Sequence, residues 1–300
     1  MLPRMRFLAA VGVILAMTSS AHAGSEARAI LDKAIQAERD KQVLDDSLAA
    51  LDRLLAKNPR DPEGHYARGW VLSRLARPAD AVAAYDQALA LDPKLADAAY
   101  NAGVVLGGMK QAKAAVGYFD KALAIDPKFV DAAYNAGQGY YNLKDFAHAA
   151  ERWTAAERNA PDDFAIAKKL VQAYHALGKD AEAAKARDKV LALHKAGKAG
   201  KVKDFVFDQF DVGRHHVYAS ETFDTSGDLA YVYRFDVEDG GKLVGSINLE
   251  TSAVLREQGM PYLLGMDKGG THAQLGKLFK TLPSYKELRP LVVDAVKAKF

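Results

Sequence analysis

Residues 97–103 read Asp-Ala-Ala-Tyr-Asn-Ala-Gly, and the same seven residues return at 131–137, 34 positions further along the chain. The same interval separates three prolines, Pro93, Pro127 and Pro161, and three glycines, Gly69, Gly103 and Gly137. A repeat of this length is typical of stacked helical hairpins, each of which buries its apolar face only against its neighbours. Such stacks present a long surface to a partner and seldom carry catalytic residues. This part of the sequence therefore predicts a binding scaffold.

Further positions of the repeat keep their residue type in three successive units. They are a bulky residue at Leu72, Leu106 and Tyr140, an alanine at Ala81, Ala115 and Ala149, an aromatic residue at Tyr85, Phe119 and Trp153, and a second alanine at Ala88, Ala122 and Ala156. Small residues at one helix crossing let two helices approach, and the aromatic side chain fills the remaining space. With the glycines and prolines, this pattern resembles the tetratricopeptide repeat family over residues 28–197. The resemblance implies five hairpins in an all-α superhelix, the repeat array of residues 24–197.

The first and last units depart from the pattern. Ile35 replaces the small residue in the first unit, and Val171, Arg187 and Lys195 replace the glycine, the aromatic residue and the proline in the last. Terminal repeats are expected to differ, because one of their faces meets solvent or another domain.

The family resemblance also implies which side chains line the concave groove, since the first helices of successive repeats form it. The implied peptide-binding or protein-binding residues are Tyr66, Trp70, Tyr100, Asn101, Tyr134, Asn135, Gln138, Tyr141, Lys168, Lys169 and Gln172. Asparagine can both donate to and accept from a peptide backbone, and tyrosine offers contact area at a low entropy cost. We therefore expect an extended peptide or a protein segment as the partner.

Two alternatives stay open for this groove. Asn101 and Asn135 either bind ligand backbone or only connect neighbouring repeats, and Lys168 and Lys169 either meet an acidic group or form a solvated face. The resemblance to relatives with a carboxylate clamp is partial, because the clamp's lysine and asparagine positions hold Tyr66 and Trp70 in this chain.

The periodicity changes beyond a linker expected at residues 198–204, within a stretch rich in lysine and glycine. Alternating aromatic and β-branched residues predict strands at 205–212, 216–223, 229–237 and 243–249, with a hairpin turn at Asp239-Gly240-Gly241. Further strands are expected near 253–256 and 262–266, a helix from Thr271 to before Pro283, a turn at 284–288 and a helix from Pro290 to Phe300. Residues 205–300 thus predict a small antiparallel α+β domain, and the fold class of the chain is α+β.

The first 23 residues predict a signal peptide. Arg4 and Arg6 precede an apolar run at 7–17, and Ala21-His22-Ala23 is a small-x-small cleavage pattern. The run is much shorter than the roughly 20 residues that span a bilayer, so we expect no transmembrane segment in the mature chain. A mature protein starting at Gly24 would be periplasmic or secreted.

Charge and residue types argue against several other functions. The chain carries 41 Lys and Arg against 38 Asp and Glu, and 39 against 38 without Arg4 and Arg6, so we expect no nucleic-acid partner. It has no cysteine, which excludes disulfides and thiolate sites. His215 and His216 are neighbours on a predicted strand and point to opposite faces, so they do not suggest a metal site. We therefore expect no enzyme, cofactor or metal.

The sequence leaves the partner and the oligomeric state open, and it supports two main hypotheses for function. The first is an exported, non-enzymatic scaffold or adaptor that binds a peptide or protein segment in the repeat groove. The alternative is a small-molecule or carbohydrate site in the C-terminal domain, with the repeats as a platform. A pocket lined by Tyr231, Tyr233, His215 and His216 would favour the alternative.

Overall fold

The computed structural model describes residues 25–199, 204–222 and 229–300. The predicted signal peptide lies outside these residues, as does most of the predicted linker. The chain forms two compact units, one ending at Asn159 and one comprising Ala160–Phe300. The fifth hairpin therefore belongs to the same unit as the C-terminal strands.

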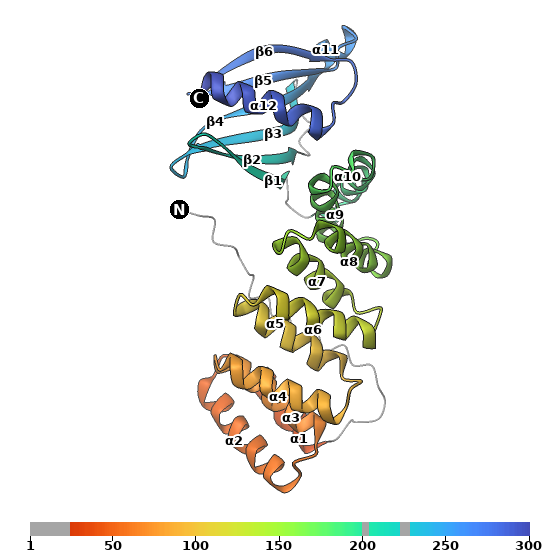
Figure 1. The fold of residues 1–300 in the computed structure, drawn as a ribbon, viewed down its shortest axis with the longest axis vertical. Coiled ribbons are helices and arrows are strands. Elements are labelled where there is room, and N and C mark those ends of the chain that lie inside the picture. Colours follow the sequence, from red (N-terminus) through yellow and green to blue (C-terminus); the bar gives the residue numbers. More distant parts are fainter. Residues whose placement is uncertain (1–24, 200–203, 223–228) are drawn as a thin grey trace. The chain divides into compact units, whose positions relative to one another are not determined.

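The described part of the first unit consists of four helical hairpins, drawn in red to green in Figure 1. Their helices are α1 (Glu26–Gln36), α2 (Lys41–Lys57), α3 (Pro62–Arg74), α4 (Pro78–Leu91), α5 (Ala96–Gly108), α6 (Ala112–Ile125), α7 (Val130–Asn142) and α8 (Phe146–Asn159). Local sequence sets several of the boundaries. Asp40 accepts hydrogen bonds from the first turn of α2, and Pro62 and Pro78 occupy the first turns of α3 and α4.

Each of the last three hairpins of this unit closes on a glycine that faces an aromatic ring. A Cβ atom on Gly69 would lie 2.8 Å from the Tyr85 ring, and one on Gly103 would lie 2.7 Å from the Phe119 ring. At Gly137 it would lie 2.5 Å from Trp153. These separations are shorter than carbon contacts allow, so the hairpin needs glycine at this position, as the sequence pattern predicted.

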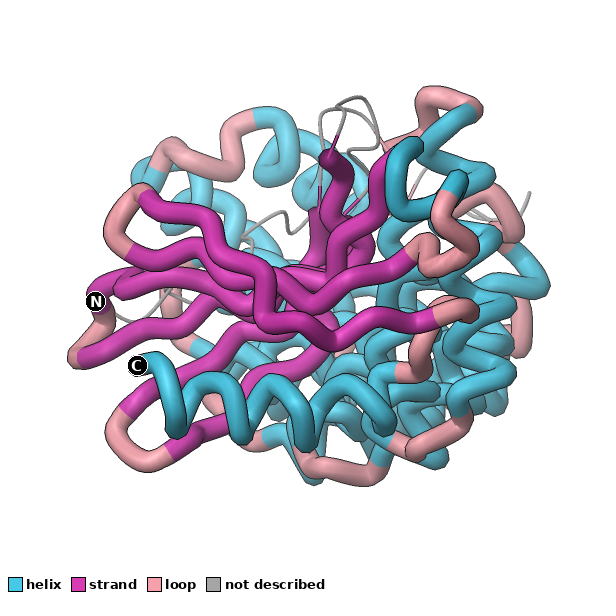
Figure 2. Tube along the Cα trace, turned by 90° about the horizontal axis from the view of Figure 1, so that it is seen from above, coloured by secondary structure: helices cyan, strands magenta, loops and turns pink. Residues whose placement is uncertain are grey.

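The second unit contains the fifth hairpin, a sheet and two further helices. Its elements are α9 (Phe164–Ala176), α10 (Asp180–Lys195), β1 (Asp204–Val212), β2 (His215–Thr222), β3 (Leu229–Asp239), β4 (Lys242–Ser252), α11 (Ala253–Glu257), β5 (Tyr262–Lys268), β6 (Thr271–Phe279) and α12 (Tyr285–Lys299). The strands pair in chain order, β1 to β6, and every pair is antiparallel. Figure 2 shows the C-terminal helix running along the strands, and its buried residues are Tyr285, Leu288, Val292 and Val296. The predicted antiparallel α+β architecture is confirmed.

Three predicted elements of this region are wrong. Residues 271–279 form β6 rather than a helix, because Gly269 and Gly270, with φ of 59° and 78°, make the tight turn of a hairpin. Gly276 also has a positive φ of 74°, which a helix does not accommodate. Residues 253–257 form the short helix α11 instead of a strand, capped by the Ser252 side chain on the Leu255 N–H.

The last helix starts five residues earlier than predicted and contains Pro290. Ser284 and Glu287 form a complete capping box at its start. Tyr285 and Leu288 are buried by this first turn, at 6% and 0% exposure. Burial and the cap outweigh the hydrogen bond that Pro290 removes, so the expected turn at 284–288 is part of the helix.

The fifth hairpin packs against the sheet within the second unit. The Gln172 side chain donates to the carbonyl oxygen of Val206 at 2.5 Å, and the His175 ring stacks on Phe207 at 4.4 Å. Arg187 forms an ion pair with Glu221, whose side chain is fully buried. Arg187 occupies the repeat position that holds an aromatic residue in the preceding hairpins, so this departure from the pattern provides a contact with the sheet.

We predict that Gly103→Ala and Gly107→Ala differ in their effect on the free energy of unfolding, although both residues lie in α5. The Cβ at position 103 meets the Phe119 ring, and the Cβ at position 107 meets no atom within 4 Å. Gly103→Ala should lower the free energy of unfolding by about 1–3 kcal/mol through overpacking. Gly107→Ala should leave it unchanged or raise it by up to about 1 kcal/mol, because alanine favours helix. Urea unfolding followed by tryptophan fluorescence measures both, and equal effects would mean that the helix crossing is misplaced.

We also predict acid sensitivity at His175. Burial, with the charge of Arg187 adding to it, lowers the pKa of His175 from 6.5 to about 4. Between these values the unfolded chain binds a proton that the folded chain does not, so stability falls as the pH falls from 6.5 towards 4. Lowering the pH from 7.5 to 5 should cost about 2 kcal/mol through this group.

His175→Phe keeps an aromatic ring and should remove this contribution. Urea unfolding followed by far-UV circular dichroism at both pH values tests it. Tryptophan fluorescence is the internal control, because both tryptophans, Trp70 and Trp153, lie in the first unit. An identical pH dependence in the variant would contradict the assignment.

Candidate functional site

The first helices of the second, third and fourth hairpins carry the predicted groove residues of the first unit. The 34-residue period places equivalent side chains on α3, α5 and α7. We define the first-helix face as the surface of these helices that carries Tyr66, Tyr100, Asn101, Tyr134 and Asn135.

Two hydrogen bonds connect consecutive repeats along this face. The Asn101 amide donates to the Tyr66 hydroxyl, and the Asn135 amide donates to the Tyr100 hydroxyl, both at 3.1 Å. Asn101 is only 8% exposed. An asparagine has two N–H donors and a carbonyl acceptor, so each side chain keeps capacity beyond this bond. The asparagines therefore connect the repeats, which supports the structural interpretation without excluding a ligand contact.

We call these two hydrogen bonds the tyrosine–asparagine ladder. Its tyrosines stay neutral over the physiological pH range. Burial raises the pKa of Tyr100 to about 12, and the charge of Asp131 adds to the effect. Burial raises the pKa of Tyr66 still further, with Asp97 adding. Asp97 itself has a pKa raised to about 6 by burial and by Asp126. Each hydroxyl accepts a bond from asparagine and keeps its own proton as a donor.

Trp70 is one of the predicted groove residues, and its side chain is buried. It is 1% exposed, and its indole N–H has no hydrogen-bond partner among the described residues. The Arg74 guanidinium lies over its ring, 4.8 Å from the centroid. A pocket of about 340 Å³ adjoins Trp70, Arg74 and Asn101.

Gln138 and Tyr141 continue the predicted set on α7. The Gln138 amide donates to Asn142 of the same helix at 3.0 Å. The Tyr141 ring packs 5.1 Å from Phe146 and 5.7 Å from Trp153, and its side chain is half-buried. Gln138 bonds within its own helix, whereas Tyr141 also supports the packing of α8.

The remaining predicted residues, Lys168, Lys169 and Gln172, lie on α9 in the second unit. The Lys168 ammonium lies 5.0 Å from the Phe164 ring centroid. Burial, and then the charge of Lys168, lowers the pKa of Lys169 to about 8. Gln172 makes the contact with Val206 described above. The structure therefore gathers one group of predicted residues in the first unit and a second group on α9.

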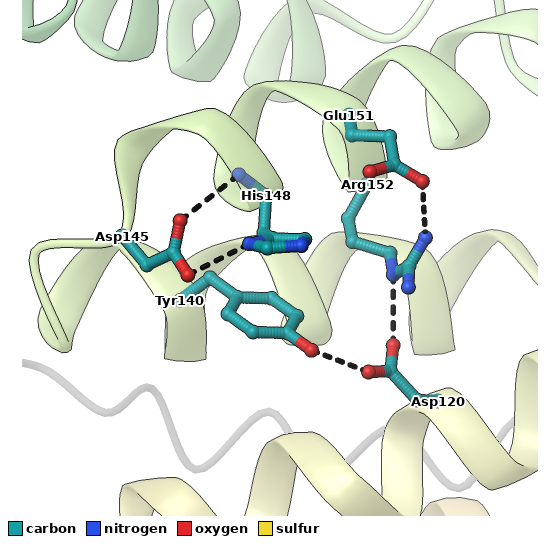
Figure 3. Close-up of polar contacts among 6 residues, drawn as sticks. All are labelled: Asp120, Tyr140, Asp145, His148, Glu151 and Arg152. Atoms are coloured by element: carbon teal, nitrogen blue, oxygen red, sulfur yellow. Dashed lines mark hydrogen bonds and ion pairs between the residues drawn. The ribbon is translucent and has the colours of Figure 1, made fainter.

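A second ladder, which the sequence analysis missed, connects the second helices of the hairpins and also includes Tyr140 of the first helix α7. Asp120 of α6 accepts hydrogen bonds from the Tyr140 hydroxyl and from Arg152 Nε, the latter at 2.7 Å (Figure 3). One repeat earlier, the Tyr118 hydroxyl donates to Asp86 in the equivalent geometry. The 34-residue interval between Asp86 and Asp120, and between Tyr118 and Arg152, was the available signal. These pairs hold the repeats in register.

The sheet carries a polar cluster on the face opposite to Ile247 and Leu249. Asp267 accepts from the Asn248 amide at 2.7 Å and lies 2.9 Å from His272 Nδ1. His272 Nε2 is 3.4 Å from Glu250, whose side chain is fully buried. Burial raises the pKa of Glu250 to about 7. The hydrogen bond with Asp267 is the main cause of the raised pKa of His272.

The histidine pair considered in the sequence does not join this cluster. His215 is 9% exposed, whereas His216 points to the other face of β2 and contacts Asp211 at 2.6 Å. Tyr233 is buried on the face of His215, and the side chain of Tyr231 lies outside the described residues.

Within the described ranges, no group of three or more His, Asp or Glu side chains is arranged to hold a metal ion. No helix of the described chain is long and apolar enough to cross a membrane.

Comparisons with known proteins match the repeat part of the chain. The model of the tetratricopeptide repeat matches residues 31–94, 66–128 and 134–197, which together make up more than half of the chain. A search of curated proteins found no significant match.

Solved structures give the same fold. The crystal structure of MamA is 23% identical, with 57% of this chain and 97% of that chain covered and a TM-score of 0.50. The MamA RS-1 ArsTM double mutant is 24% identical, with 59% and 98% covered and a TM-score of 0.50. YrrB, described as a TPR protein with an unusual peptide-binding site, is 19% identical, with 59% and 100% covered. Its TM-score is 0.46. The likeness to MamA shows the fold alone.

We predict that the Asn101–Tyr66 bond contributes to stability. Asn101→Ala should lower the free energy of unfolding by about 1 kcal/mol, because the bond is removed at a largely buried position. In a Tyr66→Phe background the same change should cost much less, since the acceptor is already absent. Gln138→Ala, which breaks a bond within one exposed helix face, should cost under about 0.5 kcal/mol. Additive effects of Asn101→Ala and Tyr66→Phe in urea unfolding would contradict the ladder.

Proposed function

The chain belongs to the tetratricopeptide repeat family, and we propose that it is an exported, non-enzymatic scaffold that binds an extended peptide or protein segment along the first-helix face. The observation that supports this most directly is the periodic pairing of tyrosine and asparagine on α3, α5 and α7. An extended segment presents backbone donors and acceptors at regular intervals, so it suits a surface whose polar groups also repeat.

The chemistry of the face supports a peptide rather than a reaction. Tyr66 and Tyr100 keep neutral hydroxyl groups, and Asn101 and Asn135 keep amide capacity beyond the ladder bonds. Amide and hydroxyl groups of this kind bind peptide backbone, and the tyrosine rings add apolar area. The face lacks the nucleophile and neighbouring base that group transfer needs, among the residues that define it.

Export is the second part of the proposal, and it rests on the N-terminal sequence. Arg4 and Arg6, the apolar run at 7–17 and Ala21-His22-Ala23 form a cleavable leader. The working location of the protein is then the periplasm or the exterior.

A specific observation favours a second candidate function in the other unit. Both carboxylate oxygens of Glu250 and the side-chain oxygen of Asn248 are buried without a hydrogen-bond partner among the described residues. Unpaired acceptors such as the Asn248 oxygen suit a ligand rich in hydroxyl groups, for example a carbohydrate. A glycan array with the intact protein and its Asn248→Ala variant tests this candidate, which requires a glycan signal that the variant loses.

We predict that peptides selected from a displayed random library bind the first-helix face. Asn135→Ala should weaken the selected peptides about 5-fold to 150-fold, as expected when a ligand group loses its partner. Lys121→Ala on α6 and Lys277→Ala on β6 change exposed lysines that are not part of this face and should leave affinity unchanged. Calorimetric titration measures each affinity, and circular dichroism checks that the variants are folded. Peptides that bind all variants equally would reject the face as the binding surface.

We predict that the mature protein begins at Gly24. N-terminal sequencing of the protein from separated envelope and cytoplasmic fractions measures this. A full-length chain in the cytoplasmic fraction would contradict export and leave the peptide-binding proposal standing.

A further inference from the structure

A pocket in the first unit contains buried donors, two of which, on Trp70 and Arg74, the tyrosine–asparagine ladder does not use. It has a volume of about 340 Å³ and is lined by residues of α3, α4 and α5. Its polar side chains are Trp70, Ser73, Arg74, Tyr85 and Asn101, and Val104 and Met109 belong to its apolar wall. This volume is at the lower end of small-molecule sites and suits one or two side chains.

The indole N–H of Trp70 is the first sign that the pocket can bind a ligand. Trp70 is 1% exposed, and its nitrogen has no hydrogen-bond partner among the described residues. The other tryptophan of the chain, Trp153, donates to the carbonyl oxygen of Tyr134 at 3.0 Å. Buried indole N–H groups normally have a partner. The contrast within one chain marks Trp70 as the exception.

Arg74 supplies the charge. Its Nε and Nη2 atoms are buried without a hydrogen bond, and its guanidinium lies 4.8 Å from the Trp70 ring centroid. Glu38 is 3.5 Å from Nη2, too far for a hydrogen bond. Among the described residues that line the pocket, Arg74 alone is charged. The pocket therefore combines one cation with neutral donors and has no anion in its wall.

We propose that this pocket takes the carboxylate side chain of an aspartate or glutamate in the segment bound along the first-helix face. A carboxylate accepts several hydrogen bonds at once and pairs with guanidinium in a planar geometry, so it can engage Arg74, Trp70 and Asn101 together. Val104 and Met109 contact the methylene groups that carry the carboxylate. The inference depends on the proposed peptide binding and adds the chemical class of one residue in the ligand.

Glu38 provides a built-in competitor. Its carboxylate is the nearest anion to Arg74, and its side chain is 44% exposed. Removing that charge frees Arg74 for the ligand. Glu38→Gln should therefore strengthen binding of an acidic peptide, whereas Arg74→Gln should weaken it. A gain in affinity cannot arise from misfolding, which makes Glu38→Gln the more informative variant.

The test uses nitrogen-15 labelling of the two tryptophan indoles in the full chain. Two probes, acetyl-Ala-Val-Glu-Val-Ala-amide and its Gln counterpart, are titrated while the two indole N–H resonances are followed by NMR. Trp70→Phe assigns the signals. We expect the Glu peptide to shift the Trp70 signal and leave the Trp153 signal in place. The unchanged protein should bind the Gln peptide at least about 10-fold more weakly than the Glu peptide, and Arg74→Gln should weaken binding of the Glu peptide by a similar factor. Glu38→Gln should bind the Glu peptide a few-fold more tightly than the unchanged protein does.

Equal affinity for the two probes would overturn the pocket assignment. A Trp70 signal that does not move at about 10 mM Glu peptide would also overturn it, because this concentration detects even very weak binding. Binding that Glu38→Gln and Arg74→Gln leave unchanged would do the same. The peptides selected on the first-helix face separate this failure from that of the proposed function. Suppose that the selected peptides carry no acidic residue, lose affinity in Asn135→Ala and keep their affinity in Arg74→Gln. This result would support the proposed function and reject the pocket assignment.

Discussion

The contact between a glycine and an aromatic ring at three helix crossings is the constraint on which the first unit depends. The Cβ positions at Gly69, Gly103 and Gly137 would lie 2.5–2.8 Å from the facing ring. Because no side chain fits there, the two helices of each hairpin approach to a fixed separation. The hairpins then stack with equivalent residues in equivalent places, and both hydrogen-bond ladders follow from that register.

The ladders explain why the repeat pattern is only a partial guide to binding. For Asn101 and Asn135 the repeat position left two roles open, a ligand contact or a connection between repeats, and each donates to the tyrosine one repeat earlier. Residues that recur in every repeat are the ones that neighbouring repeats need. Trp70 and Arg74 interrupt the recurrence, since the equivalent positions hold Val104 and Gly108 in the next repeat. A specific site is more readily built from such interruptions, because they do not take part in the contacts that recur from repeat to repeat.

The same reasoning accounts for the last hairpin. Arg187 stands where Tyr85, Phe119 and Trp153 stand in earlier units, and it pairs with the buried Glu221 of β2. Breaking a buried pair of this kind leaves an uncompensated charge, so α10 and the sheet are strongly coupled. His175 and Gln172 add contacts from α9 to β1. One of the departures that the sequence analysis took as signs of a terminal repeat, Arg187, is thus a residue that joins this hairpin to the sheet.

The sequence by itself determined the elements whose signals are local and periodic. The 34-residue period fixed the helical hairpins and their glycine–aromatic pairs, and strict alternation together with Gly240-Gly241 fixed β3 and β4. Only the tertiary structure decided β6 and the start of α12. There the outcome depends on pairing with β5 and on burial of Tyr285 and Leu288, which are contacts that form only when these elements pack together. The candidate pocket belongs to this second class, because the indole N–H of Trp70, unpaired among the described residues, and the ion pair of Arg74 with Glu38 arise only when separate segments of the chain meet.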